Sequence, residues 1–151
     1  MRSREPKALE ALHRLRSMEV DRAEGEVRAA AERVARRHQE LEKAQIARDR
    51  NATERNRVHR EEDGGTAQGW LRIRAYLDAL AERLRKGDEA LTGATHSLND
   101  AERIHGQLQE ALKSLRAEQR AAERRLAEEA RRDTLAQEER DGEDWSDGRR
   151  D

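Results

Sequence analysis

The chain has 151 residues, of which 43% are charged and 2% are aromatic. A compact globular domain has about 25% charged residues and nearly half apolar ones, so this composition argues against an ordinary globular core. The 32 basic and 33 acidic residues nearly cancel, which argues against a nucleic-acid-binding protein. The chain has no cysteine, so disulfides and thiolate metal sites are excluded.

The sequence predicts a first helix over about residues 5–62. Four branched apolar residues recur there every seven positions, namely Val20, Val27, Val34 and Leu41. A seven-residue apolar repeat is typical of the buried seam of a coiled coil. The next two seam positions hold Arg48 and Arg55, so we expect the seam to weaken or to shift toward Ile46.

The sequence predicts a turn over about residues 63–67. Gly64 and Gly65 form a helix stop signal, and Thr66 suits the N-cap of a following helix. A short connection between two long helices makes them antiparallel neighbours. Residues 1–60 hold 16 basic and 11 acidic residues, and the remainder holds 16 and 22, so the two halves attract each other.

The sequence predicts a second helix over about residues 68–140. Its heptad register continues without a skip. Its principal predicted seam residues are Leu77, Leu84, Leu91, Leu98, Leu108, Leu112 and Leu115. Gly87 and Gly93 interrupt the helix interior, and a close helix approach, a bend or a partner site could each explain them. Residues 141–151 are predicted to form an acidic, frayed tail, with Trp145 as a solvated residue rather than a docking anchor.

These patterns predict an all-α fold, a single domain over 1–151 made of two long helices in an antiparallel coiled-coil hairpin. The N-terminus lacks the apolar stretch of a signal peptide, and no apolar run approaches the roughly 20 residues that span a bilayer. We therefore expect a cytoplasmic protein without membrane insertion.

The sequence predicts no enzyme, catalytic residue, metal site or cofactor. The histidines do not pair at helical spacing, and no glycine motif of a phosphate-binding loop is present. They are His13, His38, His59, His96 and His105. Of these, His105 occupies a seam position, where a polar residue commonly sets the register.

A cluster of aromatic and apolar residues opens the second helix. It consists of Trp70, Leu71, Ile73, Tyr76, Leu77 and Leu80. We expect Trp70, Ile73, Leu77 and Leu80 to fill the seam. One partner helix cannot cover residues at all six angles, so Leu71 and Tyr76 should lie partly outside it. The alternative is that the cluster wraps over the loosely packed end of the first helix. We interpret Trp70, Leu71, Tyr76 and Leu80 as a partner-binding surface.

The ordered combination of these features resembles the FliJ/YscO family of type III secretion export proteins. The pattern Leu9-x-x-Leu12 followed by Glu19-Val20-Asp21-x-Ala23 looks like the opening of that family's first helix. After the glycine-containing turn, Trp70 with Tyr76, Leu77 and Leu80 looks like its aromatic opening of the second helix.

The resemblance implies a stalk and adaptor that enters the hexameric export ATPase and contacts the cytoplasmic domain of the export-gate membrane protein. Some family members also escort secretion chaperones. The part of the coiled coil built from both termini would face the ATPase, and Tyr76 and Leu80 would contact the export gate. The alternative interpretation of the sequence is a structural coiled-coil protein that self-associates.

Overall fold

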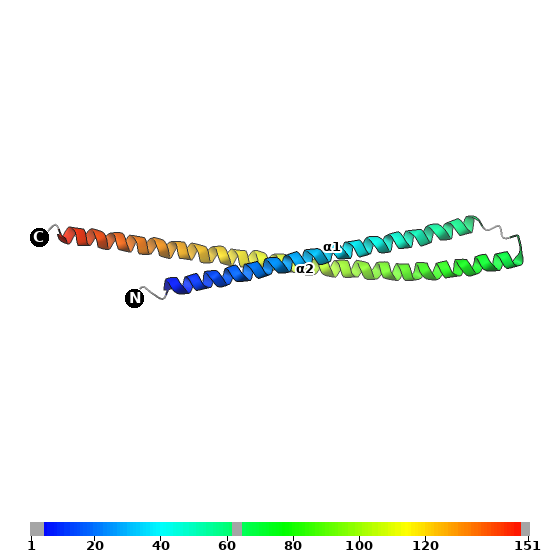
Figure 1. The fold of residues 1–151 in the computed structure, drawn as a ribbon, viewed down its shortest axis with the longest axis horizontal. Helices are drawn as coiled ribbons and strands as arrows, with labels where there is room; N and C mark the ends of the chain where they lie inside the picture. Colours follow the sequence, from blue (N-terminus) through cyan, green and yellow to red (C-terminus); the bar gives the residue numbers. More distant parts are fainter. Residues whose placement is uncertain (1–4, 62–64, 149–151) are drawn as a thin grey trace. The chain divides into compact units, whose positions relative to one another are not determined.

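The computed structural model describes residues 5–61 and 65–148, with side chains described from 7 to 61 and from 65 to 145. This part of the chain forms two helices, α1 (Glu5–Arg60) and α2 (Ala67–Gly148), which pack against each other (Figure 1). The predicted all-α helical hairpin is therefore confirmed. The helices contribute to two compact units, the first from Met1–Val27 with Leu108–Asp151 and the second from Arg28–Gln107.

The helices run antiparallel within each unit, as polar contacts between them show. In the first unit, the pairs are Arg16 with Glu118 at 3.1 Å, Ser17 with Gln119 at 3.1 Å, and Glu24 with Arg116 at 3.2 Å. In the second unit, the pairs are His38 with Glu102 at 3.5 Å, Arg48 with Asp88, and Glu54 with Tyr76 at 2.9 Å. Across the second unit the partner's number falls as the α1 number rises, which defines an antiparallel register.

The buried face of α2 follows the heptad pattern. In the heptad of α2, Leu77 occupies position a and Ile73 position d. Each a and d position from Ile73 to Leu126 is buried or half-buried, while most other positions in this range are exposed. The most buried of these residues are Leu80, Leu84, Leu98, Leu112 and Ala122. Removing such apolar surface from water is the main source of stability, at about 25 cal/mol per Å².

The buried face of α1 is narrower because several of its seam residues are alanines. Val20, Val27, Val34 and Leu41 are all buried or half-buried. In the first unit, Val20 and Ala23 form a buried cluster with Leu112, and Val27 and Leu115 pack against this cluster. The first unit thus has a small apolar core contributed by both helices.

The seam of α1 does not shift toward Ile46, which is 45% exposed. It keeps its register through Arg48 and Asn51, both half-buried, to Val58, which is 9% exposed. An arginine is tolerated at this position because its aliphatic stem covers the seam while its guanidinium reaches solvent. Here the guanidinium of Arg48 pairs with Asp88 on α2, an interaction that raises the pKa of Arg48.

The start of α2 is fixed by a side-chain cap. The Thr66 Oγ1 atom accepts a hydrogen bond from the backbone N–H of Gly69 at 3.0 Å, and the Thr66 carbonyl accepts one from the N–H of Trp70 at 3.0 Å. Both bonds are those of an N-cap residue, so the predicted role of Thr66 is confirmed. Of the predicted turn over 63–67, Gly64 lies outside the described residues, and α2 begins at Ala67.

The end of α2 differs from the prediction. The helix continues to Gly148, whereas an acidic, non-helical tail was expected from 141 onward. No proline interrupts this stretch, and a single glycine such as Gly142 costs a helix only about 1 kcal/mol. The Gln137 side chain donates to Asp141 at 3.3 Å, a contact one helical turn apart that supports the continuation. Trp145 is exposed, at 62%.

The helix-interior glycines are not required for a close helix approach. A Cβ atom added at Gly93 would meet no side chain or partner-helix atom within 4 Å, and one added at Gly87 would lie in ordinary contact, 3.9 Å from the Cβ of Arg48. Of the three explanations offered by the sequence, close approach therefore fails for both positions.

We predict that Gly93→Ala stabilises the chain. Alanine is favoured over glycine in a helix interior by about 0.8–1 kcal/mol, and the site has room for the methyl group. Thermal melting followed by circular dichroism should show a higher Tm. The reciprocal control is Ala90→Gly at an exposed position of α2, which should lower the Tm by a similar amount. A lower Tm for Gly93→Ala would contradict this account of the site.

Neither α1 nor α2, over the residues that the structure describes, contains a stretch long and apolar enough to cross a membrane.

Candidate protein-binding surfaces

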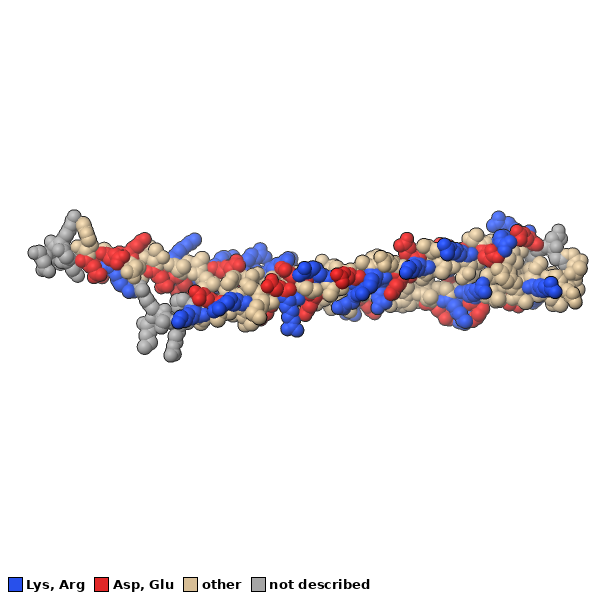
Figure 2. Space-filling view, viewed as in Figure 1, with Lys and Arg blue, Asp and Glu red and all other residues tan. Residues whose placement is uncertain are grey.

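The first candidate is an exposed apolar surface at the start of α2, called here the tip surface and defined by Trp70, Leu71 and Tyr76. Their side chains are 50%, 60% and 39% exposed, respectively. In Figure 2 uncharged surface is most continuous near the α1–α2 connection. Clustered exposed aromatic and apolar side chains are characteristic of protein-binding sites.

Trp70 is accessible because it lies in the first turn after the Thr66 cap, where α1 has ended at Arg60. The guanidinium of Arg74, one turn further along α2, lies 5.3 Å from the centre of the Trp70 ring. This distance is that of a cation–π contact. Trp70 also borders an open groove with Arg55, His59 and Ile73. The groove combines an aromatic face with guanidinium groups and with the carboxylate of Asp78.

Tyr76 joins the two helices near the same end. Its hydroxyl donates a hydrogen bond to the Glu54 Oε1 atom at 2.9 Å. Glu54 is also held by Arg57, whose Nε donates to Oε2 at 2.9 Å, and Arg57 pairs with Glu61 at 3.0 Å. The bonds from Arg57 and then from Tyr76 lower the pKa of Glu54 to about 2. The bond to the Glu54 carboxylate raises the pKa of Tyr76.

The termini of the helices add positive charge to this region. The last turn of α1 contains Arg57, His59 and Arg60, and the first turn of α2 contains no acidic residue. Arg72 borders a second groove here, beside Tyr76 and Ile73. Glu61 borders the same groove, and Arg57 is already paired with it. A partner that covers the tip surface would therefore meet apolar side chains beside charged groups of both signs.

We predict that Tyr76 ionises at a pH above the ordinary value for tyrosine and that Glu54→Gln brings its pKa back toward that value. The phenol must be protonated to donate to Glu54, so the contact is intact below the ordinary tyrosine pKa and is lost as the pH rises through the raised pKa. Because the chain has a single tyrosine, the ultraviolet absorbance of the phenolate reports this group alone. Identical titrations of the two proteins would contradict the contact.

Leu80 does not belong to the tip surface, which corrects part of the predicted site. Its side chain is 1% exposed and lies in the seam, because a leucine at a d position is drawn into the helix–helix contact. Trp70 has the opposite outcome, since it was expected to fill the seam and is half-exposed. Leu71 and Tyr76 lie outside the seam as expected.

Three residues of this region could not be identified from the sequence. No sequence pattern distinguishes Glu54 and Arg57 from other charged residues, because the bond from Tyr76 to Glu54 depends on how the two helices are aligned. Val58 is buried, but Arg48 and Arg55 at nearby seam positions interrupt the apolar repeat that would have predicted its burial. Its spacing of fourteen residues from Ala44 was the one available signal.

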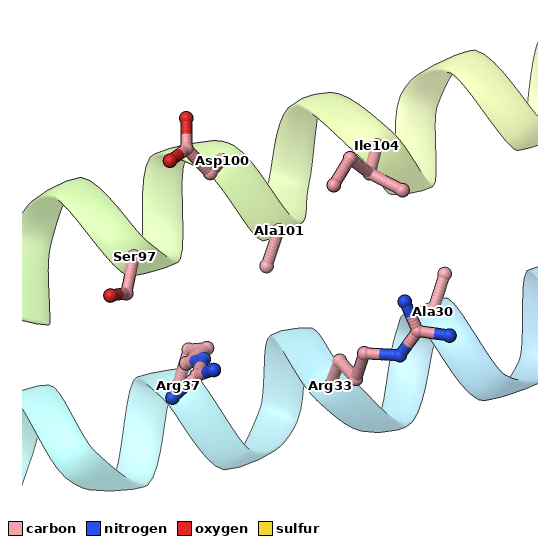
Figure 3. Close-up of a pocket in the computed structure, with 7 residues that line it drawn as sticks. All are labelled: Ala30, Arg33, Arg37, Ser97, Asp100, Ala101 and Ile104. Atoms are coloured by element: carbon pink, nitrogen blue, oxygen red, sulfur yellow. The ribbon is translucent and has the colours of Figure 1, made fainter.

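A second candidate lies in the second unit and is called here the arginine groove. It joins two adjoining hollows that share Arg33 and Arg37. The first is also lined by Ala30, Ser97, Asp100, Ala101 and Ile104, and the second by Arg36 and Glu40. Small residues on both helices leave this space open. Figure 3 shows Ala101 pointing toward α1, Arg33 extending toward α2, and Asp100 pointing away from α1. Ile104 is 37% exposed beside the groove.

The arginine groove carries uncompensated positive charge. Arg37 pairs with Glu40 at 2.9 Å, but Arg33 and Arg36 have no carboxylate partner among the described residues. The carboxylates that line the groove are Glu40, which Arg37 engages, and Asp100, which points away from α1 and lies 3.8 Å from Arg103 of its own helix. The groove thus has an apolar floor and a guanidinium border.

The structure provides no assembled metal site over 5–61 and 65–148, where no group of three or more His, Asp or Glu side chains is placed to hold an ion. His105 is half-buried in the seam. His13 is also half-buried, and its Nδ1 atom has no hydrogen-bond partner among the described residues.

Comparison with known proteins gave no match: no family model, no curated protein and no solved structure is significantly similar to this chain.

Proposed function

We propose that this chain is a stalk and adaptor of a bacterial type III protein secretion apparatus. It acts in the cytoplasm, at the inner membrane when assembled, and it binds the hexameric export ATPase and the cytoplasmic domain of the export-gate membrane protein. Secretion chaperones are further expected partners. The proposal rests on the resemblance in the ordered sequence features and on the helical hairpin that they predicted.

The observation that carries the proposal is the tip surface. Trp70 and Leu71 are exposed at the start of α2, although neighbouring apolar residues such as Leu80 are buried in the seam. Exposed aromatic side chains on an otherwise charged hairpin suit a function in binding rather than in catalysis. We assign the tip surface to the export gate and the first unit, to which both chain ends belong, to the ATPase.

The proposed contacts differ in their physical character. The exposed faces of the first unit carry ion pairs, such as Arg22 with Glu26 at 3.8 Å, so an ATPase contact there would be polar, salt-sensitive and reversible. The tip surface offers apolar anchors beside charged groups of both signs, so the gate contact would combine apolar burial with charge complementarity.

Two binding titrations test the proposal, one with the export ATPase and one with the cytoplasmic domain of the export gate, each from a bacterium with a closely similar chain. We expect saturable binding in both. Met18→Ala, at a 69% exposed position of the first unit, is the control for the gate titration and should bind the gate domain like the wild type. A chain that binds neither the export ATPase nor the gate domain would refute the proposal.

The structural alternative, a coiled coil that self-associates by pairing helices between chains, is less well supported. The seam residues of both helices are already buried within one chain, as the cluster of Val20, Ala23 and Leu112 illustrates. Pairing between chains through this seam would require the hairpin to open.

A further inference from the structure

A segment of α2 has no buried face. All side chains from Gln137 to Trp145 are exposed, although the segment is helical. A helical stretch without a buried face gains little from packing, which supplies most helical stability in proteins. Its carboxylates also lie near the helix C-terminus, where negative charge opposes the helix dipole, and the last turn of α2 contains no basic residue. A cationic surface beside it would relieve both problems.

This segment, called here the acidic segment and defined as residues 135–145, also carries apolar anchors. Leu135 and Trp145 are 59% and 62% exposed. They lie ten residues apart, which places them on one face of an α-helix, together with Gly142. The charged residues from 137 to 145 are five carboxylates against one guanidinium, that of Arg140. Glu138 lies on the same face, between the two anchors, so the face combines apolar and negatively charged side chains.

The acidic segment and the arginine groove are complementary in chemistry. The groove has an apolar floor formed by Ala30 and Ala101 beside the exposed Ile104, and its border carries Arg33 and Arg36 without carboxylate partners among the described residues. A helix with apolar anchors and flanking carboxylates is the type of ligand that such a groove accepts. Opposite charges at the rim would set the orientation and speed the encounter.

We propose that the acidic segment of one molecule docks in the arginine groove of a second copy of the same chain. The contact is made between closed hairpins, so it differs from an exchange of helices through the seam. It needs no secretion partner and is therefore independent of the function proposed above.

The test is sedimentation equilibrium of the full-length chain over a concentration series at low and high salt. We expect a mass above that of a single chain at low salt, with association at least about tenfold weaker near 0.5 M salt because screening shortens the range of charge attraction. A single-chain mass at every concentration would overturn the proposal, including the case in which the segment docks within its own molecule.

Charge reversal then identifies the surfaces. Arg33→Glu with Arg36→Glu in the groove, and separately Glu138→Lys with Glu139→Lys in the acidic segment, should each weaken self-association at least about tenfold, and a mixture of the two variants should restore it. The matched control is Arg124→Glu with Arg125→Glu, at exposed positions of α2 outside both surfaces, which should associate more strongly than the groove variant.

Circular dichroism checks that each variant keeps its helicity. Where a charge-reversed variant loses helicity, the same positions are changed to alanine instead. Self-association that all three variants share equally, or that the mixture fails to restore, would overturn the assignment of these surfaces.

Discussion

Leu112→Asp should lower the Tm of the chain by about 15 °C or more and reduce its helical circular dichroism signal. Leu112 is 7% exposed and forms the buried cluster of the first unit with Val20 and Ala23. Loss of a buried leucine alone costs about 2–5 kcal/mol, and burial of a carboxylate without a partner adds to this. A combined loss of about 5 kcal/mol corresponds to a shift of roughly 10–20 °C in a chain of 151 residues.

The control for this variant is Leu15→Asp, the same substitution in the same unit at a 51% exposed position. It should leave the Tm almost unchanged, because surface substitutions usually alter stability by no more than about 0.5 kcal/mol. Equal melting of Leu112→Asp and the wild type would show that the assigned heptad register is wrong.

Trp70→Ala should weaken binding to the cytoplasmic domain of the export gate by about 30-fold or more without altering the fold. The side chain is half-exposed and contacts Arg74 of its own helix, so its removal leaves the seam intact. An aromatic anchor at the centre of an interface contributes about 2 kcal/mol or more to binding. Titration calorimetry measures the affinity, and the helical signal checks the fold.

Leu80→Ala provides the contrasting result. Leu80 is the most buried large side chain, so this variant should lose stability while the exposed residues of the tip surface remain. Binding measured well below its Tm should be retained to a much greater extent than in Trp70→Ala. The reverse order, with Leu80→Ala impaired in binding and Trp70→Ala unaffected, would contradict the assignment of the tip surface.

The heptad pattern predicted most of the fold because burial in a two-helix protein depends on angle around the helix. Leucines at 84, 98 and 112 repeat every fourteen residues, and each lies in the seam. The pattern failed where the partner helix ends. Trp70 occupies a seam position by spacing, yet α1 ends at Arg60 and leaves the indole half-exposed.

The surfaces were harder to predict than the seam. Leu71 and Tyr76 could be placed outside the seam by their angles alone. The bond from Tyr76 to Glu54 depends on the alignment of residues from different helices, and no local pattern encodes it. The arginine groove likewise arises because Ala30 and Ala101 on separate helices leave a space between them.

The measurement that tests the proposed function most directly is the activity of a cognate type III export ATPase, titrated with this chain. The account predicts a rise in ATP hydrolysis that saturates at one chain per ATPase hexamer, as expected for a central stalk. No change in activity over the titration, with no binding to the hexamer, would contradict the proposed role in the export motor.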